Sequence, residues 1–180
     1  MLLELLRSDL ERQYELEGKR KGVTLWSIFI RLPNPRFLPI VLYRASRSLM
    51  LSGVPFIPHI FSYINLILFG IQITPKCEIG SGLFLPHTVG TVIGAWRIGS
   101  NATIFQNVTL GAKSVDMFFN PNVLPHLGNN VTVGAGAKIL GAIHIGDHVT
   151  VGANSVVVRT IPPGLTVVGV PAREVTAKNK

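Results

Sequence analysis

Aliphatic residues recur at every sixth position through most of the chain after residue 72. The series runs through Ile73, Ile79, Leu85, Val92, Ile98, Ile104 and Leu110, and resumes at Leu127, Val133, Ile139, Ile145, Val151 and Val157. One step, from Leu85 to Val92, is a residue longer than the others, and one gap separates Leu110 from Leu127. A period of six fits neither a helix nor simple alternation, so we predict a turn in every six residues.

A second inward position follows each leading aliphatic residue by four places. It is occupied by Cys77, Leu83, Val89, Trp96, Ala102, Val108, Val131, Ala137, Ile143, Val149, Ser155 and Ile161. Glycine often comes directly after the leading aliphatic residue, where a side chain would crowd the turn. Repeats this short cannot bury a face alone, so we predict that they stack on one another into a parallel β-helix.

The residues before the repeats show helical spacing instead. A charged amphipathic segment covers 2–17, and two apolar segments follow at 37–51 and 54–69, separated by Pro and Gly residues. The last of these is short and is interrupted by Pro55 and Pro58, so no membrane-spanning helix is predicted.

These patterns divide the chain into three parts. Residues 1–70 form an N-terminal α-helical region, residues 71–175 form the β-helix, and residues 176–180 form a basic tail. The gap in the six-residue series is eleven residues longer than one repeat. We therefore expect residues 112–126 to leave the β-helix as a loop, with Phe118 and Phe119 exposed on it.

The composition is that of a folded protein, with 47% hydrophobic and 14% charged residues. The formal net charge is +8, which favours an anionic partner such as a membrane surface or a phosphorylated cofactor. Nucleic acid is the least favoured partner, because no binding module matches and no aromatic residues alternate with the basic ones.

The single cysteine, Cys77, excludes an intrachain disulfide and fits a reducing compartment. The N-terminus alternates apolar and charged residues and lacks the continuous apolar block of a signal peptide. We expect a cytoplasmic protein. A peripheral contact between the helices over 37–69 and the inner face of the membrane stays open, because Arg31, Arg36, Arg44 and Arg47 flank apolar stretches.

Several stretches carry a family resemblance. ILGAIHIGDHVTVGANSVVV resembles the hexapeptide-repeat acyltransferases, and ITPKCEIGSGLFLPHTVGTVIG, IFQNVTLG and IPPGLTVVGVPAREV resemble their serine acetyltransferase branch. That branch includes L-serine acetyltransferases and relatives that acetylate sugars of surface polysaccharides. The resemblance implies a left-handed parallel β-helix, acetyl-CoA as donor, a hydroxyl group as acceptor, and a homotrimer with active sites between subunits.

Two histidines are the candidate catalytic residues. Acyl transfer to an alcohol requires a base, and the ordinary histidine pKa of about 6.5 leaves much of the side chain unprotonated near neutral pH. His87 follows the inward Leu85 by two residues, and the resemblance implies that it is the general base. His126 ends the predicted loop, where the family has a second histidine, and Gln72 takes a supporting position. From the residues alone, His87 also fits a structural histidine at a turn.

The resemblance also implies an acetyl-CoA site along small residues and basic groups. Its positions are Gly111, Ala112, Ala135 and Ala153 for the pantetheine arm, and Lys138, Arg159 and Arg173 for the phosphates.

Three positions depart from the serine acetyltransferase pattern. Gln72 and Pro86 replace acidic residues, and Pro125 replaces an arginine. A zwitterionic amino acid needs charged partners in a dry site, whereas a neutral sugar hydroxyl does not. We therefore expect a sugar of a bacterial surface polysaccharide or its precursor as acceptor, with L-serine, as in cysteine biosynthesis, as the alternative.

Two other classes of function remain open. Zinc carbonic anhydrases share this β-helix, but His144 and His148 do not match their ligand spacing, and we predict no metal site. A non-catalytic scaffold would use the same repeats without needing His87 or His126.

Overall fold

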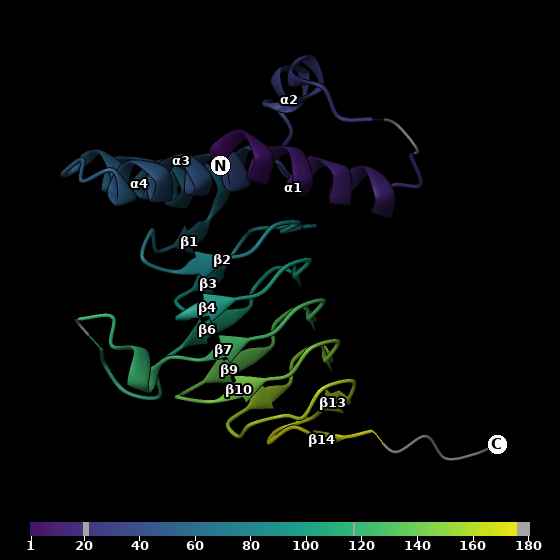
Figure 1. Ribbon diagram of the computed structural model, residues 1–180. Coiled ribbons are helices and arrows are strands. Elements are labelled where there is room, and N and C mark those ends of the chain that lie inside the picture. Colours follow the sequence, from purple (N-terminus) through teal and green to yellow (C-terminus); the bar gives the residue numbers. More distant parts are fainter. Residues whose placement is uncertain (20–21, 117, 176–180) are drawn as a thin grey trace.

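The computed structural model describes residues 1–19, 22–116 and 118–175, and it consists of a layer of helices on one end of a column of short strands (Figure 1). The predicted basic tail, residues 176–180, lies outside the described residues. None of the helices in the described ranges combines the length and the apolar character that crossing a membrane requires.

The helical layer contains one helix that the sequence pattern did not predict. Its members are α1 (Leu2–Leu16), α2 (Leu25–Arg31), α3 (Leu38–Leu51) and α4 (Ile57–Phe69). The first, third and fourth correspond to the predicted helical segments. The short α2 begins at Thr24, whose side chain accepts a hydrogen bond from the Ser27 N–H while Ser27 caps Thr24 in return.

The column is a triangular prism with three walls of stacked strands. Wall A contains β1 (Ile71–Ile73), β3 (Thr91–Ile93), β6 (Thr109–Gly111), β9 (Lys138–Leu140) and β12 (Val156–Val157). Wall B contains β2 (Glu78–Ile79), β4 (Arg97–Ile98), β7 (His126–Leu127) and β10 (His144–Ile145). Wall C contains β5 (Thr103–Ile104), β8 (Thr132–Val133), β11 (Thr150–Val151), β13 (Thr166–Val168) and β14 (Arg173–Glu174).

The chain passes from wall A to B to C in each coil, and all neighbouring strands pair in parallel except β13 and β14. The coils must approach closely at the corners. At Gly134, for example, an added Cβ atom would lie 2.7 Å from the backbone nitrogen of Ala153 in the next coil. The frequent glycine after the leading aliphatic residue is therefore explained by contact between coils.

Inward aliphatic residues of all three walls form one core along the prism. Nearly all the predicted inward positions are buried, so the six-residue period is confirmed as the basis of the fold. The predictions for Val89, Val92 and Trp96 were wrong. Val89 and Val92 are exposed and Trp96 is only partly buried, while Ile93 and Ala95 point into the core.

The reason lies in the irregular step after Leu85. Ile93 is aligned with Ile73 and with Leu110 in the neighbouring strands, so it, and not Val92, is the wall A core residue. The corner between Leu85 and Ile93 is thus two residues longer than the regular one between Ile104 and Leu110, and the next corner is one residue shorter. Counted along the sequence, the two changes appear only as their sum, which is one extra residue between Leu85 and Ile98. The longer corner contains His87.

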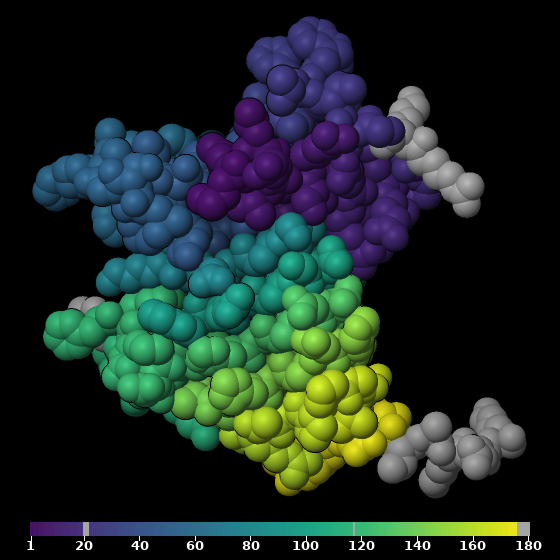
Figure 2. Space-filling model, viewed as in Figure 1, coloured from purple at the N-terminus to yellow at the C-terminus, as the bar shows by residue number. Residues whose placement is uncertain are grey.

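The helical layer is attached to the first coil by buried polar contacts. Arg44 on α3 forms an ion pair with Asp9 on α1, Nε to Oδ2 at 2.9 Å, and also donates to the carbonyl groups of Ile79 and Gly80. Both side chains of the pair are almost fully buried. The Asp9 carboxylate also accepts the N–H of Leu83. The layer therefore covers the N-terminal end of the prism (Figures 1 and 2).

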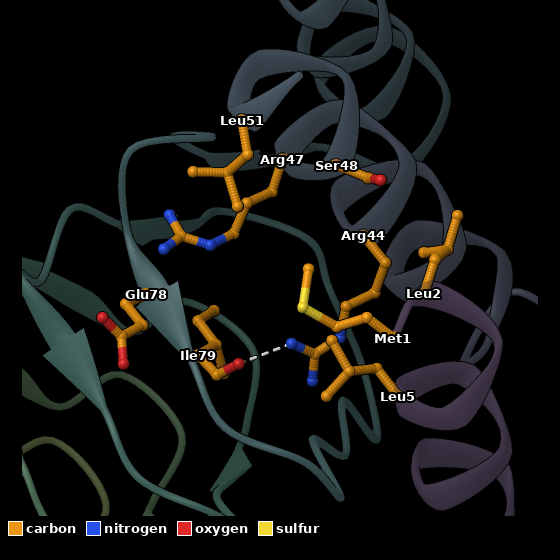
Figure 3. A pocket seen from close by; sticks show the side chains of 9 residues that line it. All are labelled: Met1, Leu2, Leu5, Arg44, Arg47, Ser48, Leu51, Glu78 and Ile79. Carbon is orange, nitrogen blue, oxygen red and sulfur yellow. Dashed lines mark hydrogen bonds between the residues drawn. The ribbon is translucent and has the colours of Figure 1, made fainter. Parts of the chain in front are cut away.

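A cavity of about 240 Å³ lies at this junction, between α1, α3 and β2 (Figure 3). It contains neither candidate histidine. Its arginines are already bound, Arg44 as described and Arg47 to the carbonyl oxygens of Pro75, Lys76 and Cys77, each at 3.0 Å. The cavity therefore belongs to the junction between the helical layer and the prism, and not to a site built around the candidate histidines.

Candidate active site

His87 lies at the corner between walls C and A, in the long corner that precedes β3. Pro86 before it and Thr88 after it are buried, whereas His87 itself is exposed. The Thr88 hydroxyl donates to the carbonyl oxygen of Phe69 at the end of α4, at 2.8 Å. The neighbours therefore fix the backbone, and the imidazole is accessible to a bound molecule.

Gln72 is the outward residue of β1 on wall A. With His59 and Tyr63 of α4, it lines a small cavity of about 170 Å³. The hydrogen bonds found among the described residues do not join it to His87. Its predicted supporting role therefore stays a prediction.

His126 is the first residue of β7 and points outward from wall B. The β-ladder aligns it with Arg97 on one side and with His144 on the other. The rings of His126 and His144 are tilted against each other, with centroids 4.9 Å apart. Partial burial lowers the pKa of His126, and the neighbouring His144 and Arg97 lower it further, against a hydrogen bond to the Pro121 backbone. His126 is therefore predominantly neutral near pH 7.

The sequence analysis did not identify Arg97 and His144 as neighbours of His126. A signal was present, because each of the three residues directly precedes a leading aliphatic residue of the six-residue series. Together they line an open groove on wall B of about 550 Å³, which also includes Asn129 and Asp147. Arg97 adds a positive charge beside His126, and its Nε lies 3.2 Å from the Glu78 carboxylate.

Between β6 and β7, the described residues 112–116 and 118–125 belong to neither strand. The Asp116 carboxylate accepts the backbone N–H groups of Phe118 and Asn120, which stabilises the turn. Phe118 is 87% exposed, as predicted. The prediction that Phe119 is exposed was wrong, because its ring packs against Trp96 at 5.6 Å and contacts the core.

The two histidines occupy different corners of the prism. His87 lies at the C–A corner, whereas His126 follows the loop at the A–B corner, so the full width of wall A separates the two positions in one chain. The small residues predicted for acetyl-CoA are divided in the same way. Ala135 and Ala153 stack at the C–A corner, with the Asn154 N–H donating to the Ala135 carbonyl oxygen at 2.8 Å, while Gly111 and Ala112 begin the loop at the A–B corner.

We call these groups the C–A half-site and the A–B half-site. The first consists of His87, Ala135 and Ala153, and the second of Gly111, Ala112 and His126. One chain contains both half-sites but keeps them on different edges of wall A.

The predicted phosphate-binding residues do not form one cluster. Lys138 is on β9 in wall A, where its Nζ donates to the carbonyl oxygen of Asn107. Arg159 is exposed two residues after the end of β12, and Arg173 is on β14 in wall C. Lys138 therefore lies between the half-sites, Arg159 at the A–B corner, and Arg173 on another wall.

His144 and His148, the two histidines considered as metal ligands, lie on different parts of the prism. His144 lies on wall B, whereas His148 is at the B–C corner with its Nε2 3.5 Å from the Asn130 amide. Across residues 1–19, 22–116 and 118–175, no three His, Cys, Asp or Glu side chains gather as metal ligands would.

Comparison with known proteins points to one family. Residues 125–159 match the family described as bacterial transferase hexapeptide (six repeats). The chain is 42% identical over 145 residues to a serine acetyltransferase of Synechococcus elongatus, covering 80% of the chain but only 58% of that protein. It is 41% identical over 152 residues to the serine acetyltransferase of Helicobacter pylori, covering 84% of the chain and 86% of that protein. The chain thus spans little more than half of some relatives and most of others.

Solved structures point to the same family. The serine acetyltransferase of Neisseria gonorrhoeae superimposes with a TM-score of 0.82 at 33% identity, over 99% of the chain and 68% of that structure. The same Neisseria enzyme in complex with serine gives a TM-score of 0.81 at 32% identity, over 97% of the chain and 69% of that structure. A serine acetyltransferase in complex with CoA gives 0.80 at 29% identity, over 97% and 69%.

Proposed function

Since the chain belongs to the hexapeptide-repeat acyltransferases, in the serine acetyltransferase branch with its left-handed β-helix, we propose that it transfers the acetyl group of acetyl-CoA to a hydroxyl oxygen. The main support from the structure is the exposed His87 on a rigid corner, together with a neutral histidine at the other half-site. A similar protein that binds CoA supports the donor.

In the proposed reaction His87 is the general base. It removes the proton of the acceptor hydroxyl while the oxygen forms a bond to the carbonyl carbon of the thioester. The tetrahedral intermediate then breaks its carbon–sulfur bond, and the CoA sulfur leaves with the proton returned by the imidazolium. His126, kept neutral by its surroundings, holds the acceptor or the oxyanion through a hydrogen bond.

The acceptor that the relatives favour is L-serine. This corrects the preference for a polysaccharide sugar, because each of the relatives named above is a serine acetyltransferase. The sugar was favoured because Pro86 and Pro125 supply no charge. Arg97 changes that argument, because it lies beside His126 and presents a guanidinium group that can pair with a carboxylate. We therefore place serine first.

A neutral hydroxyl acceptor is the second candidate. The observation in its favour is the Pro86–His87 pair, because the buried proline leaves no acid next to the base to bind an ammonium group. The two candidates differ in what Arg97 does. If serine is the acceptor, Arg97→Gln raises KM for serine by about tenfold or more, which corresponds to losing one charge-assisted hydrogen bond. If the acceptor is neutral, the same change leaves KM nearly constant.

The test is an acceptor screen that follows release of the CoA thiol from acetyl-CoA, with L-serine beside nucleotide sugars and oligosaccharides. His87→Ala should reduce kcat by a factor of about 10² to 10⁴, the usual contribution of a general base, while circular dichroism and the thermal midpoint stay unchanged. Turnover that survives His87→Ala would remove His87 from the reaction. A chain that binds but never turns over any acceptor would instead be a scaffold.

A further inference from the structure

The positive charge of the protein is concentrated in one segment. Residues 18–77 contain no acidic residue and eight basic ones, which are Lys19, Arg20, Lys21, Arg31, Arg36, Arg44, Arg47 and Lys76. The rest of the chain contains nine basic and nine acidic residues. The entire net charge of +8 therefore comes from the segment that forms α2, α3, α4 and the first strand.

The same segment exposes a compact apolar surface on α2. Of its seven residues, Leu25, Trp26, Phe29 and Ile30 are between 60% and 68% exposed, and the Trp26 and Phe29 rings stack with centroids 5.6 Å apart. Ile28 alone is buried, in a small core with Leu10 and Phe37 that fixes α2 to the other helices. The exposed residues are thus held outward by a packed helix.

The position of α2 makes this surface accessible. It projects beyond α1 at the end of the molecule opposite the C-terminal coil (Figures 1 and 2). Neither half-site is in the helical layer, so contact at α2 leaves the prism walls free.

We propose that α2 is an interfacial anchor that places the protein on an anionic lipid membrane. Exposed aromatic and aliphatic side chains beside basic residues are the combination that inserts into the headgroup region of such a surface. Near α2, Lys19 and Arg36 are exposed, and Arg36 is free of ion pairs within the described residues. A second copy of this surface is a poorer partner, because residues 1–70 contain nine basic and five acidic residues, so two such ends are both net positive and repel one another.

The test measures co-sedimentation of the full chain with vesicles of phosphatidylglycerol and phosphatidylcholine, against vesicles of phosphatidylcholine alone. We expect binding to the anionic vesicles that is at least tenfold stronger. Phe29→Ser with Ile30→Ser should lower this binding by about tenfold or more, because two inserting side chains are lost. The matched control, Val115→Ser with Phe118→Ser, removes even more exposed apolar residues from the loop and should leave binding unchanged.

A second pair of variants tests, by the same co-sedimentation, how much basic side chains contribute to vesicle binding. Arg36→Gln should weaken binding several-fold, whereas Arg159→Gln, after β12, should not. In a Trp96→Phe background, the fluorescence of Trp26 should shift to shorter wavelength on addition of anionic vesicles. Absence of binding, or equal losses in the α2 and loop variants, would overturn the proposal. So would concentration-dependent self-association that Phe29→Ser with Ile30→Ser abolishes without any vesicle binding, since the occupant would then be a second copy. The readouts do not involve acetyl transfer and are independent of the proposed function.

Discussion

At the scale of single residues, the environment of His126 is set by side chains from neighbouring coils. Arg97 and His144 are distant in sequence, yet the β-ladder places them on either side of it. The motif around His126 therefore predicts a candidate site residue, whereas the stacking of coils supplies the neighbours that lower its pKa. The six-residue period is sufficient to derive such ladders from sequence once each residue is assigned to a wall.

The environment of His126 leads to a prediction about how the reaction depends on pH. In His144→Ala the ring that packs against His126 and contributes to lowering its pKa is lost, so the pKa of His126 should rise. If the proposed reaction needs His126 in its neutral form, the acidic limb of the kcat/KM profile should move to higher pH. The same rise should be visible when the His126 ring is titrated by NMR.

His148→Ala is the matched control, because His148 is exposed at the B–C corner and should leave the limb in place. A His126 pKa that does not rise in the NMR titration of His144→Ala would contradict this prediction; the acidic limb alone does not decide it, because the proposed base His87 also contributes to that limb.

Gly111 offers a second test at this scale. An added Cβ atom has no heavy atom within 4 Å among its non-adjacent neighbours, so Gly111→Ala should leave the unfolding midpoint unchanged. If the pantetheine arm runs along the A–B half-site, the methyl group should raise KM for acetyl-CoA by about tenfold. Gly22→Ala, equally open but located before α2, should change neither quantity. Normal KM in Gly111→Ala would place the donor elsewhere.

At the scale of elements, the predictable and unpredictable parts have different physical origins. Walls made of regular repeats follow from burial alone, because aliphatic residues recur at the leading inward positions. The coil around His87 was misassigned at Val89, Val92 and Trp96, because a longer corner and a shorter one nearly cancel in the sequence count. The short α2 was missed because its apolar residues cover most of the helix and show no helical period.

The attachment of α1 to the prism depends on one buried ion pair. Asp9→Asn leaves the charge of Arg44 buried without its partner and should lower the free energy of unfolding by about 3–5 kcal/mol. On the same helix, Glu11 pairs with Arg7 in solvent, so Glu11→Gln should cost less than about 1 kcal/mol. Urea unfolding of both variants makes the comparison. Equal effects would mean that the buried pair does not stabilise the layer.

At the scale of the whole molecule, the two half-sites make the proposed reaction depend on more than one chain. A reaction that needs both His87 and His126 must bring the C–A corner of one chain to the A–B corner of another. In a closed ring of three identical chains, each contact between neighbours forms one complete site. The predicted homotrimer is thus linked to catalysis, and light scattering should give three chains per particle.

Subunit mixing tests this arrangement directly. His87→Ala and His126→Ala should each be inactive as pure trimers, because every site then lacks one histidine. When the two variants are unfolded and refolded together in equal amounts, three quarters of the trimers are mixed and each has one site with both histidines, so about a quarter of the wild-type activity should return. Mixing without refolding is the control and should restore little, since intact trimers exchange slowly. If both histidines served the site of their own chain, no mixture would recover activity, because every chain would lack one of them.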